Sequence, residues 1–175
     1  EFTVFAKRHL GHEYSIDHQG NRWLVLTNDA NDADGTHNED AVNRKLMEVA
    51  VGGDTERTAW TELIAHRDHV TLESVEPFER FVVLNEREGG LVHLRVLDVE
   101  SGSDTRLAMP EPLYTVYGTN NPNYQTETFR IGYQSMVTPR SVFDVDLVSG
   151  DRTLLKETPV LGGYDRTQYT TERRW

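Results

Sequence analysis

The sequence predicts an all-β protein that forms part of a β-propeller. Short runs of alternating apolar and polar residues, such as FDVDLV at 143–148, are bounded by Gly, Asn, Asp or Ser. Alternation with a period of two, punctuated by turn residues, is typical of β-strands. Helical periodicity is nearly absent. The same runs also recur at a fixed spacing, and this recurrence indicates repeated units of similar structure.

The repeat is visible in two families of segments that alternate along the chain. The turn glycines of one family, Gly53, Gly102 and Gly150, are 49 and 48 residues apart. This family comprises LMEVAVGGDTER (46–57), RVLDVESGSDTR (95–106) and SVFDVDLVSGDRT (141–153). The family that precedes it comprises NRWLVLTND (21–29), ERFVVLNER (79–87) and ETFRIGYQS (127–135). Because both families repeat together, chance alternation is a poor explanation.

Each repeat contains four expected strands. They lie near 13–18, 22–27, 44–51 and 57–64 in the first repeat, near 70–76, 80–86, 91–98 and 105–109 in the second, and near 113–118, 127–133, 141–147 and 152–157 in the third. The stretch 40–51 could also be helical, but its place in the repeat favours a strand. Four antiparallel strands in about 45–50 residues are typical of a propeller blade. A β-sandwich is the alternative, although it does not explain a register repeated twice.

The predicted blades are too few to close a ring. The chain supplies about three four-stranded antiparallel blades and one leading strand, FTVFAKR at 2–8, whereas closed propellers use about four to eight blades. An open stack leaves the apolar faces of its end blades in water. We therefore expect the 175 residues to be a piece of a longer chain and to self-associate. The Asp/Asn-rich stretch at 29–40 is predicted to be a loop insertion in the first blade.

Composition narrows the classes of partner. The chain carries 29 acidic and 18 basic side chains, a net charge of −11, with 20 of the acids within residues 1–100. Such a surface repels phosphate backbones, so no nucleic-acid partner is expected. The absence of Cys rules out disulfides, thiolate metal sites and a Cys nucleophile. No apolar run approaches the ~18 residues of a membrane span, so we expect no membrane partner and a cytoplasmic location.

Several motifs resemble functional sites but fail on their spacing. Asp34-Gly35 suggests a calcium loop, yet Ala30 and Ala41 would then occupy its first and last ligand positions. His9, His12, His66 and His69 lack further ligands that would complete a zinc site. Ser135, in GYQSM at 132–136, has no second Gly to form a G-x-S-x-G elbow. A solvated loop, ordinary histidines and a structural serine are the preferred interpretations.

Aromatic residues provide the remaining candidates. Tyr117, Tyr124 and Tyr164 lie in or beside turn-rich segments that could line a binding surface, but turn chemistry alone explains the Gly, Asn and Pro around them. Trp23 and Trp60 are predicted to pack in the core or between blades, and Trp175 is a similar case. We therefore predict no catalytic, cofactor-binding or metal-binding residue in this chain, and no cofactor.

Particular stretches resemble the propeller domain of the oligopeptidase B (protease II) branch of the prolyl oligopeptidase family. The resemblance is collinear and covers almost the whole chain. It is carried by GHEYSIDHQGNRWLVLTN (11–28), by WTELIAHRDHVTLESVEPFERFVVLNEREGGLVHLRVLD (60–98), by the stretch from EPLYTVYG to LGGYD (111–165) and by TERRW (171–175). The chief departure is the insertion around 29–40. The matched region resembles the C-terminal part of a seven-bladed propeller.

The resemblance implies that this chain has a noncatalytic role. Members of this family are serine peptidases in which a propeller covers an α/β-hydrolase domain that cleaves short peptides after Arg or Lys. Their Ser, Asp and His triad follows the element matching TERRW, so residues 1–170 are expected to be propeller and 171–175 the start of a linker toward that catalytic domain. The partners implied are the catalytic domain and short basic peptides, with the propeller gating access. One alternative is a stand-alone protein-binding scaffold. A stand-alone hydrolase or metalloenzyme is the other, but the absence of the motifs that such enzymes need argues against it.

Overall fold

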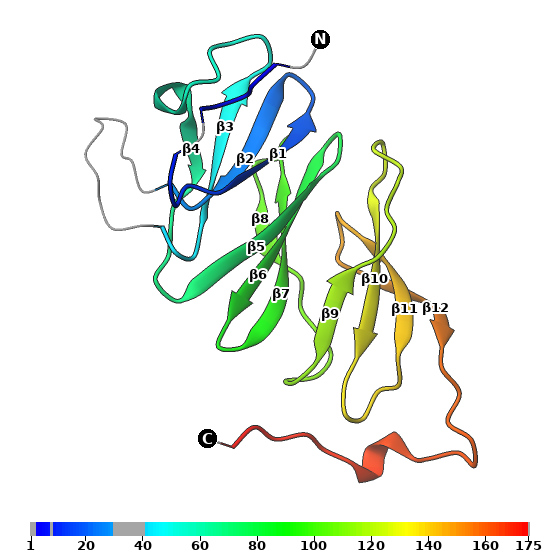
Figure 1. The fold of residues 1–175 in the computed structure, drawn as a ribbon. Coiled ribbons are helices and arrows are strands. Elements are labelled where there is room, and N and C mark those ends of the chain that lie inside the picture. The colour runs from blue at the N-terminus through cyan, green and yellow to red at the C-terminus, as the bar shows by residue number, and fades with distance from the viewer. Residues whose placement is uncertain (1–2, 8, 30–40, 175) are drawn as a thin grey trace.

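Twelve strands form three four-stranded antiparallel sheets that stack side by side as blades (Figure 1). The computed structural model describes residues 3–7, 9–29 and 41–174. In chain order the strands are β1 (Tyr14–Gln19), β2 (Arg22–Thr27), β3 (Lys45–Ala50), β4 (Thr61–Ile64), β5 (Val70–Pro77), β6 (Phe81–Glu88), β7 (Leu91–Asp98), β8 (Asp104–Arg106), β9 (Thr115–Gly118), β10 (Thr128–Gln134), β11 (Ser141–Asp146) and β12 (Arg152–Glu157). Each sheet follows the order of the chain, so the predicted partial propeller of three blades is confirmed.

Two details of the prediction are wrong. Residues 3–7 of the expected leading strand form no strand; Phe5 and Ala6 instead pack on the face of the first blade. No sheet edge in the described part of the chain pairs with this segment. It is held by burial of these side chains, by the Tyr14 hydroxyl, which donates to the Ala6 carbonyl at 3.2 Å, and by an ion pair between Lys7 and Glu56. Within the expected strand 57–64, a 3-10 turn at Arg57–Ala59 precedes β4. The predicted loop at 29–40 lies, apart from Asp29, outside the described residues.

The repeated turn glycines have a common physical basis in the second and third blades. Gly102 and Gly150 adopt positive φ values of 72° and 78°, a conformation that is readily accessible to glycine. Each backbone N–H donates to the carbonyl of the aspartate four residues earlier, Asp98 or Asp146, at 2.8 Å. In the first blade the Gly53 N–H instead donates to the carbonyl of Ala50, three residues earlier, at 3.0 Å. There the left-handed residue is Gly52, with φ 79°, rather than the aligned Gly53.

Apolar side chains from facing blades form the core. One cluster joins the first and second blades and consists of Leu24, Leu26, Leu46, Ile64, Leu72, Val82 and Leu84. A larger cluster joins the second and third blades and consists of Phe78, Phe81, Val83, Leu94, Val96, Val116, Phe129, Ile131, Tyr133, Val145 and Leu147. Strands β2 and β6 are the most continuously buried segments. Each lies in the middle of its sheet, so its side chains are covered on both faces of that sheet.

A third apolar cluster covers the outer face of the first blade. Trp60, which is 6% exposed, packs there with Val25, Met47 and Val49, and Trp23 borders the cluster. The predicted packing roles of both tryptophans are therefore confirmed. Phe5 adds an aromatic contact to Trp23, with ring centroids 6.1 Å apart. The N-terminal segment thus shields part of a face that has no neighbouring blade.

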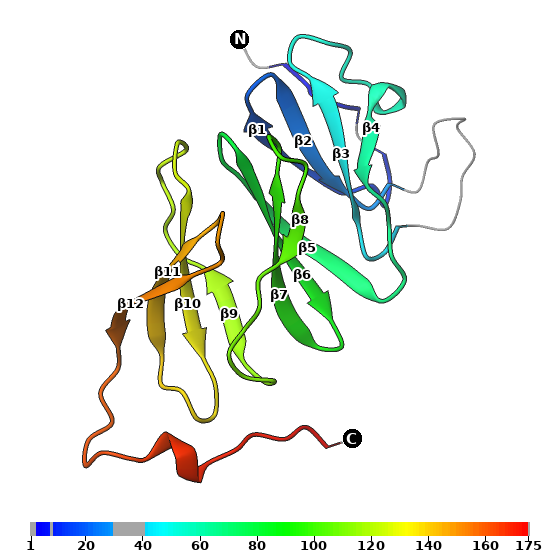
Figure 2. The same cartoon turned by 180° about the vertical axis from the view of Figure 1, so that it is seen from behind.

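Long-range contacts tie the blades together at two ends. The loop between β9 and β10 reaches the first blade, where the Tyr124 hydroxyl accepts a hydrogen bond from the Gly20 N–H at 2.9 Å. At the opposite end, residues 158–174 leave β12 and run back across the third blade toward the second (Figures 1 and 2). There an Arg173 guanidinium donates to the Gly89 carbonyl in the β6–β7 turn. No helix in the described part of the chain is long and apolar enough to cross a membrane.

Candidate functional site

The first strands of the three blades converge on a half-buried carboxylate. Glu76 in β5 lies close enough to Asp17 in β1 for the two charges to interact. A Cβ built on Gly118 in β9 would stand 3.1 Å from Glu76 Oε2. The Asn121 side chain is also close enough to Glu76 to lower its pKa. These contacts place the three first strands along one acidic inner edge.

Burial makes this edge unusual electrostatically. Burial raises the pKa of Asp17. Burial also raises the pKa of Glu76. The Asn121 side chain partly opposes this increase, and the Asp17 charge adds to it. A cavity of about 240 Å³ lies along the same edge and is lined by Glu13, Asp17 and Glu73, among others. Carboxylates that remain ionised in such a setting attract cationic groups.

Replacing Glu76 by glutamine should stabilise the fold at neutral pH. The folded-state pKa of Glu76 is raised, so its ionised form opposes folding above that pKa, and this penalty disappears as pH falls below the unfolded value. We expect the melting temperature of Glu76→Gln to exceed that of the parent by about 2 °C at pH 7 and to converge with it near pH 4. Thermal melts by circular dichroism at both pH values measure this. A lower melting temperature at pH 7 would contradict it.

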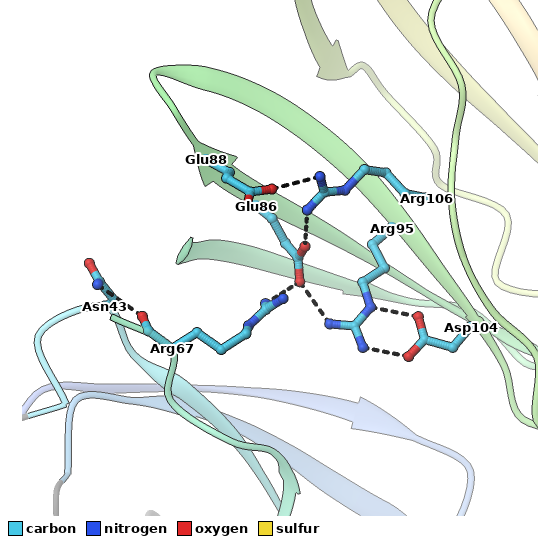
Figure 3. Close-up of polar contacts among 7 residues, drawn as sticks. All are labelled: Asn43, Arg67, Glu86, Glu88, Arg95, Asp104 and Arg106. Atoms are coloured by element: carbon cyan, nitrogen blue, oxygen red, sulfur yellow. Dashed lines mark hydrogen bonds and ion pairs between the residues drawn. The ribbon is translucent and has the colours of Figure 1, made fainter. Parts of the chain in front are cut away.

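A second polar cluster surrounds a buried carboxylate between the first and second blades (Figure 3). Glu86 in β6 is fully buried and accepts hydrogen bonds from Arg67, from Arg95 Nη1 at 2.9 Å and from Arg106 Nη2 at 3.3 Å. Arg67 belongs to the connection between the two blades, whereas Arg95 and Arg106 come from β7 and β8. One carboxylate therefore joins a connecting segment and three strands of the second blade.

The outer members of this cluster complete its charge balance. Arg95 Nε lies 2.6 Å from Asp104, and Arg106 Nη1 lies 2.7 Å from Glu88. Burial raises the pKa of Glu86, but bonds to Arg67 and Arg95 outweigh it and hold the pKa below its usual value. Three guanidinium groups thus face three carboxylates. Such a network fixes the positions of its side chains. Its carboxylates bond to arginines and are therefore not available to bind a ligand.

A third feature is a cavity of about 550 Å³ beside the third blade, beneath the C-terminal segment. The connection between the second and third blades supplies Pro110, Glu111 and Pro112 to its wall. Strands β10 and β11 supply apolar and aromatic side chains, and residues 166–171 close one side. Its volume is in the range of small-molecule sites.

His12, His66 and Ser135, for which the sequence favours ordinary structural roles, make hydrogen bonds or ion-pair contacts within the fold. His12 Nε2 lies 2.9 Å from the Thr27 hydroxyl, and burial lowers its pKa. His66 lies 3.8 Å from Asp68. Within the residues that the structure describes, no three His, Asp or Glu side chains are placed to hold a metal ion. Ser135 Oγ accepts the N–H groups of Val137 and Thr138 at 2.9 and 2.7 Å, so it caps a turn.

The three candidate tyrosines are not brought together. Tyr124 holds the loop between β9 and β10, whereas Tyr164 donates its hydroxyl to the Val137 carbonyl at 2.9 Å, beyond the other end of β10. Tyr117 is 36% exposed, and its ring lies over the backbone of Gly132. A binding surface shared by all three is therefore excluded. The buried Glu86 cluster and the cavity were missed at the sequence level.

A stack of three four-stranded antiparallel blades, with the first strands converging on one edge, defines a section of a β-propeller. Residues 1–158 match the family model "Prolyl oligopeptidase, N-terminal beta-propeller domain". The chain belongs to this family.

Similar proteins extend this assignment. The chain is 39% identical to dipeptidyl aminopeptidase BI of Pseudoxanthomonas mexicana over 174 residues, which is 99% of this chain and 22% of that protein. It is 28% identical to Protease 2 of Moraxella lacunata, over 93% of this chain and 21% of the relative. Oligopeptidase B from Leishmania major superposes with a TM-score of 0.77 at 29% identity, covering 94% of this chain and 23% of that one. The chain thus spans about a fifth of the length of these relatives, which are larger peptidases.

Proposed function

We propose that the chain is the noncatalytic, substrate-gating propeller segment of a serine-type oligopeptidase. The observation that carries this proposal is the family match over residues 1–158, in a chain that covers 22% of a peptidase relative. The turn-capping role of Ser135 agrees with a segment that holds no nucleophile. Residues 171–175 would lead toward an α/β-hydrolase domain, and the described residues among them lie outside the third sheet.

The purified 175-residue chain should hydrolyse no peptide substrate. We expect activity only when the chain is joined to the rest of its parent protein beyond Trp175, because the catalytic triad is proposed to lie there. Release of a fluorescent amine from an N-blocked peptide ending in Arg measures this directly. Hydrolysis by the isolated chain would overturn the noncatalytic assignment. An extended chain that folds without gaining activity would favour the stand-alone scaffold instead.

The acidic inner edge suggests how the segment contributes to selectivity. A cleft lined by one charge concentrates ligands of the opposite charge, with an effect that falls with ionic strength. We expect Asp17→Asn in the parent enzyme to lower kcat/KM for a peptide with two arginines and to weaken its salt dependence. Asp151→Asn, in an exposed turn on the outer side of the third blade, is the matched control. Identical salt dependence in both variants and the parent would exclude steering by this edge.

The position of cleavage is a separate part of the proposal. Cleavage after Arg or Lys is what the resemblance to the oligopeptidase B branch implies, and the presence of Protease 2 and an oligopeptidase B among the similar proteins supports this candidate. Similarity to a dipeptidyl aminopeptidase over 99% of this chain favours a second candidate, the release of dipeptides from a free N-terminus. An N-blocked substrate ending in Arg can be cleaved only by the first activity. The second activity requires a substrate whose N-terminus is free.

We also propose that the isolated chain self-associates. Among the residues that the structure describes, no further blade lies on the outer side of the third blade, and Leu155 in its edge strand β12 is 47% exposed. Exposed apolar surface of this kind favours association. Light scattering at increasing concentration should give a mass above 20.0 kDa. A monomer at all concentrations with a cooperative melt would contradict this expectation.

A further inference from the structure

The cavity beneath the C-terminal segment combines apolar walls with buried hydroxyl groups. Ile131, Val137 and Phe143 line it on the side of the third blade. Tyr133 reaches it from β10 and is only 2% exposed. Thr170 and Thr171 line it from the C-terminal segment. The third sheet, the connection between the second and third blades, and the C-terminal segment therefore bound the cavity together.

Two hydroxyl groups at this cavity are left without partners. Tyr133 Oη and Thr171 Oγ1 are both buried, and neither has a hydrogen-bond partner among the residues that the structure describes. Glu111 is close enough to affect Tyr133, since burial and then the Glu111 charge raise the pKa of that phenol to about 12. Glu111 Oε1 accepts a hydrogen bond from Thr138, and although a minor side-chain interaction with Glu111 adds to the raised pKa, the Tyr133 hydroxyl makes no hydrogen bond of good geometry among the described residues. Because an unsatisfied buried hydroxyl is costly, the pair indicates a missing polar ligand.

The charges around the cavity are nearly balanced. Arg166 pairs with Glu157, and Arg152 Nη1 donates to the Ala108 carbonyl at 2.7 Å. Glu111 supplies one carboxylate against the Arg152 guanidinium. A ligand with net charge would find no surplus of the opposite charge here. An uncharged ligand that has both hydrogen-bond donors and acceptors suits the arrangement better.

We propose that this cavity binds an uncharged peptide unit that carries an apolar side chain. The carbonyl oxygens of such a unit accept from the Tyr133 and Thr171 hydroxyls, and its N–H groups donate to Glu111. Its side chain packs against Ile131 and Phe143. The site holds peptide without cleaving it and is distinct from the acidic inner edge. It depends on this chain alone, so its failure would leave the proposed peptidase role intact.

Titration of the ¹⁵N-labelled chain with N-acetyl-leucinamide tests this directly. We expect saturable shifts of the amide resonances of Val137, Thr138, Thr170 and Thr171, with a dissociation constant on the order of 1 mM for so small a ligand. N-acetyl-argininamide and the α-amide of N-acetyl-aspartic acid, each of which carries one side-chain charge, should bind at least about fivefold more weakly, because the balanced cavity has no surplus charge to offset their desolvation. Equal affinity for all three compounds would overturn the proposed selectivity.

Single-atom variants locate the binding to the two hydroxyls. Tyr133→Phe and Thr171→Val should each weaken N-acetyl-leucinamide binding by about fivefold, the loss of one hydrogen bond. Tyr117→Phe removes a hydroxyl from the same blade outside the cavity and should leave binding unchanged. Without ligand, Tyr133→Phe should melt at an equal or higher temperature than the parent, since it removes an unsatisfied group. Thr171 lies outside the sheets, so its variant provides a test that does not depend on packing in the blade.

Two results would refute the site. Absence of any saturable shift would mean that the cavity holds only water, which then satisfies both hydroxyls. Shifts that persist with unchanged affinity in both Tyr133→Phe and Thr171→Val would place the peptide elsewhere on the chain.

Discussion

Replacing Glu86 by alanine should lower the free energy of unfolding by about 3–5 kcal/mol, because it leaves three arginines without their shared carboxylate. Glu86 is 0% exposed and receives bonds from Arg67, Arg95 and Arg106 (Figure 3). Removing one partner from a buried ionic network is costly even where the intact network adds little net stability. Urea denaturation, followed by intrinsic tryptophan fluorescence, measures the change.

The control for this experiment is the neighbouring carboxylate of Glu88. Glu88 pairs with Arg106 at 2.7 Å, but its side chain is 39% exposed. Exposed ion pairs contribute about 0–1 kcal/mol, so Glu88→Gln should change the free energy of unfolding by no more than that. Equal effects of Glu86→Ala and Glu88→Gln would show that burial does not distinguish the two carboxylates.

The Glu86 cluster also predicts how stability depends on pH. The pKa of Glu86 is held below its ordinary value of 4.5, so its contribution to stability is present above that value and is lost as pH falls through the folded-state pKa. The pKa of Asp104 is lowered in the same sense, chiefly by its bond to Arg95. Between pH 5 and pH 3 the parent should therefore lose stability more steeply than Glu86→Gln. A steeper loss in the variant would contradict this assignment.

Truncating Phe129 to alanine should destabilise the fold by about 3–5 kcal/mol, the range for removing a buried phenylalanine. Phe129 is 0% exposed in the cluster between the second and third blades, where its ring meets Phe78 edge to face at 5.8 Å. A Cβ built on Gly118 would stand 2.8 Å from the end of the Phe129 ring. This close packing leaves little room for another side chain to fill the resulting space.

The loss at Phe129 should be insensitive to salt and pH, since it arises from apolar packing. Phe129→Leu, which retains most of the apolar volume, is the matched variant and should cost clearly less than alanine. Guanidinium and urea denaturation of both variants give the comparison. A loss below about 1 kcal/mol for Phe129→Ala would mean that the two blades repack around the cavity.

The regular parts of the fold were predictable because they repeat. All twelve strands lie where alternation and the 48–49-residue spacing place them, since each blade must bury side chains on its faces. The segment at 2–8 misled because Phe2, Val4 and Ala6 recur at every second position of the sequence as in a strand, yet no sheet edge in the described part of the chain pairs with residues 3–7. In this segment alternation reports neither which side chains are buried, since Val4 is 74% exposed, nor whether the backbone is paired.

The sites were harder to predict because they depend on contacts between distant segments. A signal for the Glu86 cluster is present in the sequence, because Val82, Leu84 and Glu86 occupy the same face of one strand. A carboxylate at an inward position requires a buried partner. Its partner Arg67 is supplied from outside the second blade, however, and nothing in the spacing identifies it. The cavity depends on where residues 166–171 return to the third blade, which alternation cannot specify.

The bond between Gly20 and Tyr124 has a consequence for the order of folding. Strands that pair within a blade follow one another in the chain, so their pairing closes comparatively short loops. The bond between Gly20 and Tyr124 instead joins residues 104 positions apart. Contacts of high sequence separation carry a larger entropic cost before they contribute stability, and they slow folding. We expect the individual meanders to form first and the tyrosine loop to lock onto the first blade last. Tyr124→Phe should then accelerate unfolding while leaving the rate of folding nearly unchanged.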